Sequence, residues 1–203
     1  DPFYGQFPKA TLGIAYFFNN QFEEAEDILL SGIKYYESHG EGNTAGVCRY
    51  FLAPIQIAKG KMNQGKQLMQ NTQKALIDNN RRVHYALSEY ILGEVNLQIV
   101  AGPKPSLPIM AKNLGFLIRN VPFASQNAEK HLCNAIKLLE QMKVKVYLGL
   151  AYLSLGLLHK HKRKTAQARQ HILDAIQIFK ECEAYVYLEQ ANEALNSIKI
   201  ADM

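Results

Sequence analysis

Small and large hydrophobic residues recur along the chain at fixed spacings that are typical of paired helices. Each copy begins with a large residue directly followed by a small one, called here the large-small pair. Four further matching positions lie three, twelve, sixteen and nineteen residues after the small residue. In the first copy these positions hold Leu12, Gly13, Tyr16, Ala25, Leu29 and Gly32. A later copy keeps every spacing with Leu155, Gly156, His159, Ala168, Ile172 and Ala175. Another holds Leu52, Ala53, Gln56, Gly65, Met69 and Thr72. Three matches predict a repeated helical hairpin.

The small residues of this pattern predict close contact between the two helices of each hairpin. Gly13, Ala25 and Gly32 would let the backbones approach, while the large residues fill the gaps between the helices. Poor helix formers or clustered charges lie where the turns are expected, at residues 19–20, at Gly60 and at residues 160–164. Because one hairpin cannot bury its apolar face alone, the copies are expected to stack side by side.

The remaining copy is divided by an insertion of 23 residues. Leu92, Gly93 and Asn96 start its first helix, and Ala128, Leu132 and Ala135 fit its second helix. The insertion covers roughly residues 102–125, and its prolines are Pro103, Pro105, Pro108 and Pro122. Prolines at this density predict irregular structure, with a short helix possible at residues 110–120.

The sequence therefore predicts an all-α fold, a right-handed α-α superhelix that forms one domain over residues 1–203. The expected hairpins cover residues 7–38, 43–78, 83–142 with the insertion 102–125, and 146–180. A terminal helix over residues 183–199 is expected to cover the open end of the stack. Since the chain enters a helical repeat within its first ten residues, we interpret it as a fragment of a longer protein.

The repeated spacings resemble the tetratricopeptide motif, whose family binds peptides or helices of partner proteins along a concave groove. A closer likeness involves residues 112–116, 120–125, 155–160 and 175–179. These segments are similar to the C-terminal repeat regions of large bacterial proteins in which a class III nucleotide cyclase domain and an ATPase domain precede the repeats. The likeness covers about the last hundred residues. It implies a regulatory or assembly arm of a signalling protein, and it transfers no catalytic residue.

The tetratricopeptide resemblance implies that the binding groove is lined by first-helix residues around each large-small pair. The candidate residues are Phe17, Phe18, Tyr50, Ile57, Tyr90, Glu94, Leu97, Gln98, Leu153, Leu157 and Lys160. Because this wall is mostly apolar, we expect a partner helix, a second copy of the chain or the insertion to cover it. One hypothesis is that the insertion folds back into the groove through Leu114, Phe116, Leu117, Ile118, Val121 and Phe123. The alternative is that it packs on the outer side.

No motif in the sequence predicts catalysis or the binding of a cofactor or metal. Residues 60–67 have the spacing of a phosphate-binding loop, but Gln67 stands where Ser or Thr would hold magnesium. We therefore interpret Gly60 as a turn and Gly65 as a close-packing position. His159 and His161 are two residues apart and would point in different directions on a helix, which disfavours a metal site. His159 also occupies the position of Tyr16, which favours a packed role.

The charge of the chain is mildly basic, with a formal net charge of +5. Residues 159–164 are the densest basic run and could meet a phosphate or an acidic surface. Alternatively, they form a solvated turn at the carboxyl end of a helix, where cations are favourable. Because no aromatic residues are interleaved with the run, nucleic-acid binding is less favoured. Three scattered cysteines and the lack of a long apolar run predict a cytoplasmic location and no membrane span.

Together these features predict a non-catalytic protein–protein interaction or regulatory module. Its partner would be another protein, sister domains of the parent chain or a second copy in a homo-oligomer. The alternative interpretation is that the parent protein synthesises a cyclic nucleotide, with all catalytic residues upstream of Asp1. A nucleic-acid-binding regulator is the least favoured class.

Overall fold

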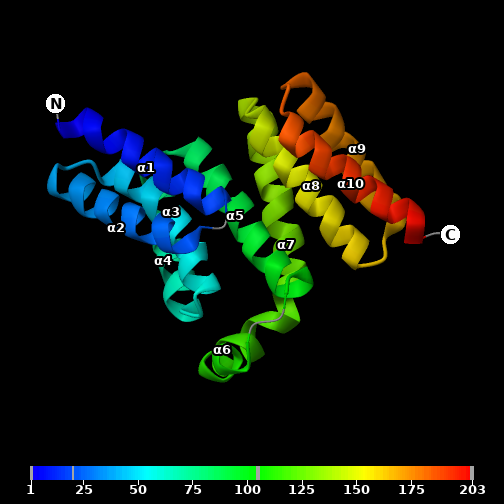
Figure 1. Cartoon of the computed structure of the whole chain (residues 1–203), viewed down its shortest axis with the longest axis horizontal. Coiled ribbons are helices and arrows are strands. Elements are labelled where there is room, and N and C mark those ends of the chain that lie inside the picture. The colour runs from blue at the N-terminus through cyan, green and yellow to red at the C-terminus, as the bar shows by residue number, and fades with distance from the viewer. Residues whose placement is uncertain (1, 20, 104–105, 202–203) are drawn as a thin grey trace. The chain divides into compact units, whose positions relative to one another are not determined.

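The computed structural model describes residues 2–19, 21–103 and 106–201, and every regular element among them is a helix (Figure 1). The all-α prediction is therefore confirmed. The chain divides into two compact units, one formed by Asp1–Ser88 with Ser106–Leu117 and the other by Glu89–Pro105 with Ile118–Met203. In the described ranges, no helix is both long and apolar enough to cross a membrane.

The first unit is built from helical hairpins with short connections. It contains α1 (Pro2–Phe18), α2 (Phe22–Ser38), α3 (Gly42–Ala58), α4 (Met62–Asp78), the start of α5 (Arg82–Ala101) and α6 (Leu107–Lys112). α2 packs on both α1 and α3, and α4 packs on α3. The first helices of successive hairpins begin at residues 2, 42 and 82. Each hairpin is therefore longer than a tetratricopeptide repeat of about 34 residues.

The second unit contains the remainder of α5, most of α7 and the three helices that follow. These helices are α7 (Leu114–Met142), α8 (Lys145–His161), α9 (Thr165–Glu181) and α10 (Tyr185–Ala201). α8 and α9 form a hairpin, and α10 packs on α9 and, less extensively, on α8. The expected terminal helix is thus present, although it leaves Tyr185 and Val186 69% and 68% exposed.

The second helix of every hairpin buries the positions that the repeated spacing predicts. The buried residues are Ala25, Leu29, Gly32, Gly65, Met69, Thr72, Ala128, Leu132, Ala135, Ala168, Ile172 and Ala175. In the first helices, Leu52 and Leu155 are also buried, but Leu12 is 44% exposed. The prediction that Leu12 fills a gap is wrong. Helix α1 contacts α2 extensively and α3 only slightly, whereas α3 contacts both α2 and α4 extensively.

Several glycines stand where two helices come too close for a side chain. A β-carbon at Gly65 would lie 2.5 Å from the carbonyl oxygen of Ala53. A β-carbon at Gly156 would lie 2.6 Å from Ile172 Cγ1, and one at Gly93 would lie 2.6 Å from two carbons of Leu132. These contacts confirm that small residues set the approach of paired helices.

A repeated turn connects the helices. Six of the described turns contain a residue with a positive φ, which is 74° at Gly40, 79° at Gly60 and between 53° and 57° at Asn80, Lys143, Arg163 and Glu183. At one of these turns, the amide of Lys61 donates to the carbonyl of Gln56 at 2.7 Å, and that of Gly60 donates to Ile57 at 3.0 Å. This pair of bonds is the Schellman helix end. It confirms Gly60 as a turn; Asn20 lies outside the described residues.

The insertion is more helical than predicted. α7 begins at Leu114 and continues through Pro122 to Met142, so the expectation that Pro122 ends irregular structure is wrong. An internal proline removes one backbone hydrogen bond and costs about 3 kcal/mol. In this 29-residue helix the cost is offset by packing further along, where Ala124, Ala128 and Leu132 are fully buried. Pro108 lies in the first turn of α6, where no amide is needed. Pro105 lies outside the described residues.

The hypothesis that the insertion folds back into the groove is also wrong for most of its apolar residues. Leu114, Ile118, Val121 and Phe123 are 46% to 65% exposed, whereas Phe116 is buried and Leu117 is half-buried. These residues belong to one continuous helix, so their side chains lie along its surface and are not free to turn inward separately.

Candidate functional site

The predicted groove residues of the first unit form an aromatic contact between α1 and α3. The rings of Phe17 and Phe18 lie 5.4 and 5.8 Å from that of Phe51, both in edge-to-face geometry. Tyr50 lies beside Phe51, with ring centroids 4.4 Å apart, and is almost fully buried. Ile57 is half-buried and Phe18 is 37% exposed. The aromatic residues therefore contribute first to helix packing.

The predicted groove residues of the second unit come from α5 and α8. Tyr90, Leu97 and Leu153 are buried, Glu94, Leu157 and Lys160 are half-buried, and Gln98 is exposed. The ammonium of Lys160 donates to Ser197 Oγ of α10 at 2.6 Å. Burial and this internal contact leave Gln98 as the most accessible member of the set. The candidate wall in this unit is thus largely packed.

Glu94 is a carboxyl group held in an apolar environment. Its Oε1 is enclosed, and no hydrogen-bond partner for that oxygen is found among the described residues. Burial raises the pKa of Glu94, and a hydrogen bond with Ser154 opposes this shift only in part. The charged form of an enclosed carboxyl is costly, so this arrangement favours the protonated acid. A protonated Glu94 would donate a hydrogen bond rather than carry charge.

Tyr90 lies near this carboxyl group and belongs to a group of tyrosines. Burial raises the pKa of Tyr90 well above its usual value, and the nearby Glu94 adds to the shift. The rings of Tyr90 and Tyr147 meet edge to face at 6.2 Å. Burial also raises the pKa of Tyr147, with a contribution from Tyr187. Burial therefore favours the neutral form of both tyrosines and of Glu94.

We expect Glu94→Gln to change how stability depends on pH. An acid whose pKa is raised on folding binds more protons in the folded state between its ordinary and its raised pKa, so stability falls as pH rises through that window. The amide cannot ionise, so urea unfolding between pH 4.5 and pH 8 should show a flatter pH profile for the variant. His84 and His171 are half-buried, and desolvation lowers their pKa values, so they act in the opposite direction in both proteins. Parallel profiles for the two proteins would contradict the assignment.

A second polar cluster, which sequence analysis did not predict, joins α7 to the end of α8. Glu129 accepts a hydrogen bond from Lys162 Nζ at 2.6 Å, and its other oxygen lies 3.2 Å from His159 Nε2. The bond from Lys162, opposed by burial and reinforced by His159, lowers the pKa of Glu129 to about 2. His159 is 3% exposed, which confirms its packed role. With Lys160 and Lys162 engaged internally, part of the basic run is not available to a ligand.

A third cluster centres on Glu89, one of the most buried acids in the described chain. Its carboxylate accepts a hydrogen bond from Asn134 Nδ2 at 3.1 Å and lies 3.0 Å from His131 Nδ1. These contacts fix α5 against α7. The sequence carried one signal, since Ser88 and Glu89 interrupt an apolar run over residues 86–91. The partners of Glu89, however, lie more than forty residues away.

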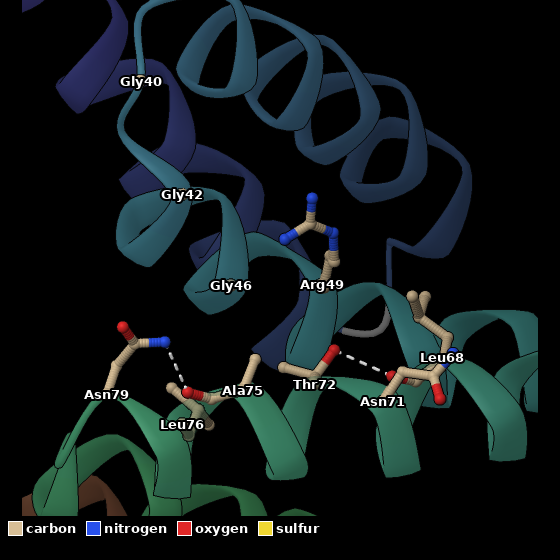
Figure 2. Close-up of a pocket in the computed structure, with 10 residues that line it drawn as sticks. All are labelled: Gly40, Gly42, Gly46, Arg49, Leu68, Asn71, Thr72, Ala75, Leu76 and Asn79. Carbon is tan, nitrogen blue, oxygen red and sulfur yellow. Dashed lines mark hydrogen bonds between the residues drawn. The ribbon is translucent and has the colours of Figure 1, made fainter.

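A depression of about 530 Å³ lies in the first unit between α3 and α4 (Figure 2). It is lined by Gly40, Gly42, Gly46, Arg49, Leu68, Asn71, Thr72, Ala75, Leu76 and Asn79. Figure 2 shows the glycines of α3 facing the side chains of α4. Thr72 Oγ1 and Asn79 Nδ2 both donate to carbonyls of their own helix at 2.8 Å. The described lining residues include no histidine, cysteine or carboxylate.

The phosphate-loop spacing at residues 60–67 does not form a phosphate-binding loop. Gly60 is in the turn before α4, and Gly65 lies inside α4 against the backbone of Ala53. Both glycines therefore have the structural roles that the repeat predicts. Within the described ranges, no group of three or more His, Cys, Asp or Glu residues is placed to hold a metal ion.

Comparison with known families does not assign the chain. No protein-family profile matches the sequence, and no curated protein sequence matches it significantly.

Proposed function

We propose that the chain is a non-catalytic module that binds a protein partner. The observation that carries this proposal is the exposure of large apolar side chains on the first half of α7 in the second unit. Ile118 is 65% exposed, Val121 46% and Phe123 57%. Ile118 and Val121 are three residues apart and therefore lie on the same face of the helix. Contiguous apolar exposure on a protein surface is typical of contact sites.

The polar clusters support a structural role rather than chemistry. Glu129 is paired with Lys162 and His159, and Glu89 is paired with His131 and Asn134. Glu89 is almost fully buried, so removal of its partners would leave an uncompensated buried charge. Burial keeps the hydroxyl of Tyr90, which lies near Glu94, in its neutral form.

The likeness of residues 112–116, 120–125, 155–160 and 175–179 to cyclase–ATPase repeat regions suggests the setting in which the module acts. In this proposal the chain is a cytoplasmic arm of a multidomain signalling protein, and its partner is a sister domain or a separate protein. Cyclic-nucleotide synthesis would then belong to other domains of the parent chain. A cyclase assay on these 203 residues should give no product. Product above background would overturn the non-catalytic assignment.

Site-specific photocrosslinking tests the proposed contact surface. Benzoylphenylalanine would replace Ile118 in the full-length parent protein, expressed in its own host, and the matched control would place it at exposed Lys137 of the same helix. We expect a discrete adduct, to a partner or to another domain of the parent chain, at position 118 and none at position 137. Equal labelling at both positions, or none at position 118, would show that the apolar residues of α7 are not a contact surface.

A further inference from the structure

The depression of Figure 2 has a counterpart in the second unit that is filled. The hairpins α3–α4 and α8–α9 have helices of equal length and connections of equal length, so their positions correspond one to one. Gly46 and Gly149 are each the fifth residue of their first helix, and Leu76 and Phe179 are each the fifteenth residue of their second helix. The two hairpins therefore differ at this place by a leucine in one and a phenylalanine in the other.

The phenylalanine ring occupies the space over the glycine in α8–α9. A β-carbon at Gly149 would lie 2.6 Å from Phe179 Cε1 and 2.9 Å from its Cδ1, so the ring lies directly on the glycine. Phe179 is fully buried. At Gly46, by contrast, a β-carbon would find no described heavy atom of a neighbouring element within 4 Å. Leu76 does not reach across.

At two further corresponding positions, α3–α4 has a smaller residue than α8–α9. Gly42 stands where α8 has Lys145, and Ala75 stands where α9 has Ile178. Both Gly42 and Ala75 line the depression. The ring of Phe179 fills the corresponding place in α8–α9, whereas Leu76 leaves it open in α3–α4.

We propose that this depression binds the aromatic side chain of a partner peptide. Leu68, Ala75 and Leu76 supply an apolar wall, and the glycines of α3 allow a flat ring to approach the helix backbone. Asn71 and Asn79 are exposed at the lining and carry amides that can meet a peptide backbone.

The charge at the site favours a neutral ligand. Arg49, which also lines the depression, forms an ion pair with Glu37 of α2. The guanidinium charge of Arg49 is therefore already balanced. A neutral phenyl or phenol side chain fits this balance better than a free anion does.

The experiment is a titration of the whole chain with N-acetyl-phenylalanine amide, followed by ¹H–¹⁵N correlation spectra. We expect saturable shifts at the amides of Gly42 and Gly46, with dissociation in the millimolar range that is usual for one small group. N-acetyl-leucine amide is the aliphatic control and should bind at least fivefold more weakly. Equal shifts with the two probes, or shifts spread over the surface, would overturn the proposal.

Variants that fill the depression from within provide the matched test. Leu76→Phe supplies the ring that α9 has at Phe179 and should weaken probe binding at least tenfold. Ile77→Phe adds the same ring at the next position, which is 57% exposed, and should leave binding unchanged. If Leu76→Phe does not fold, Gly46→Leu blocks the opposite wall, where the space is open. Undiminished binding in a folded filled variant would overturn the proposal.

The depression shares no residue with the exposed part of α7 on which the proposed function rests. A negative titration would remove the depression as a binding site and leave the crosslinking result at position 118 unaffected. Conversely, probe binding at Gly42 and Gly46 would stand even if no adduct formed at position 118.

Discussion

Gly65→Ala is expected to destabilise the first unit by about 3 kcal/mol, at the upper end of the range for overpacked cores. The added β-carbon would lie 2.5 Å from the carbonyl oxygen of Ala53 and 2.6 Å from Ile57 Cγ1. A side chain can rotate away, but the Ala53 carbonyl belongs to the backbone of α3. The two helices must therefore move apart, which would loosen the packing of α4 on α3.

Residue-resolved hydrogen exchange of the α4 amides measures this effect within one unit, without assuming that the whole chain unfolds in a single step. The matched control is Gly46→Ala in α3, where a β-carbon has open space. That substitution should raise the free energy of opening by up to about 1 kcal/mol, since alanine is the better helix former. If both variants show the same protection as the parent chain, the close approach at Gly65 is not what holds the hairpin together.

The second-helix core could be predicted from sequence because one physical rule governs it. A helix that contacts its partner along one face repeats small and large residues on that face, whatever lies in the connecting segment. Ala128, Leu132 and Ala135 were therefore placed correctly although an insertion divides their copy. The prediction for Leu12 was wrong because burial in a first helix also depends on a neighbouring helix on its other side. The local pattern holds no information about that neighbour.

The helix through Pro122 could not be predicted from local rules. Proline carries a known cost in a helix, but the packing that offsets the cost comes from Ala124 onward and from helices distant in sequence. The pairing of Glu129 with His159 and Lys162 could not be predicted for the same reason. The partners are about thirty residues apart, and spacing within one helix gives no information about them.

The candidate groove shows a different limit of prediction from sequence. Its residues were chosen by position in the first helices, and that choice does not separate a side chain that faces solvent from one that packs on a neighbour. Tyr50, Tyr90, Leu97 and Leu153 are all buried. The depression in α3–α4 was missed for the opposite reason. It arises from volume that is absent at Gly46 and Leu76, and a search for functional side chains does not detect missing ones.

Phe179→Ala is expected to destabilise the second unit by about 3–5 kcal/mol, the usual cost of emptying a buried phenylalanine position. The ring is fully buried, lies on Gly149 and packs against Tyr187 of α10 with ring centroids 5.6 Å apart. Its removal should therefore weaken both the α8–α9 hairpin and the docking of α10. Tyr185→Ala is the control, because Tyr185 is 69% exposed and should cost less than about 0.5 kcal/mol.

Phe179→Leu separates the role of the ring from the role of bulk at this position. This variant has a leucine opposite Gly149, as the first unit has Leu76 opposite Gly46. It should therefore lose less stability than Phe179→Ala and open a depression over Gly149. Hydrogen exchange of the α9 and α10 amides would rank the variants, and N-acetyl-phenylalanine amide should then shift the amide of Gly149. If leucine is as stable as phenylalanine and leaves Gly149 insensitive to the probe, the glycine does not require a ring above it. The correspondence drawn between the two hairpins would then fail in both units.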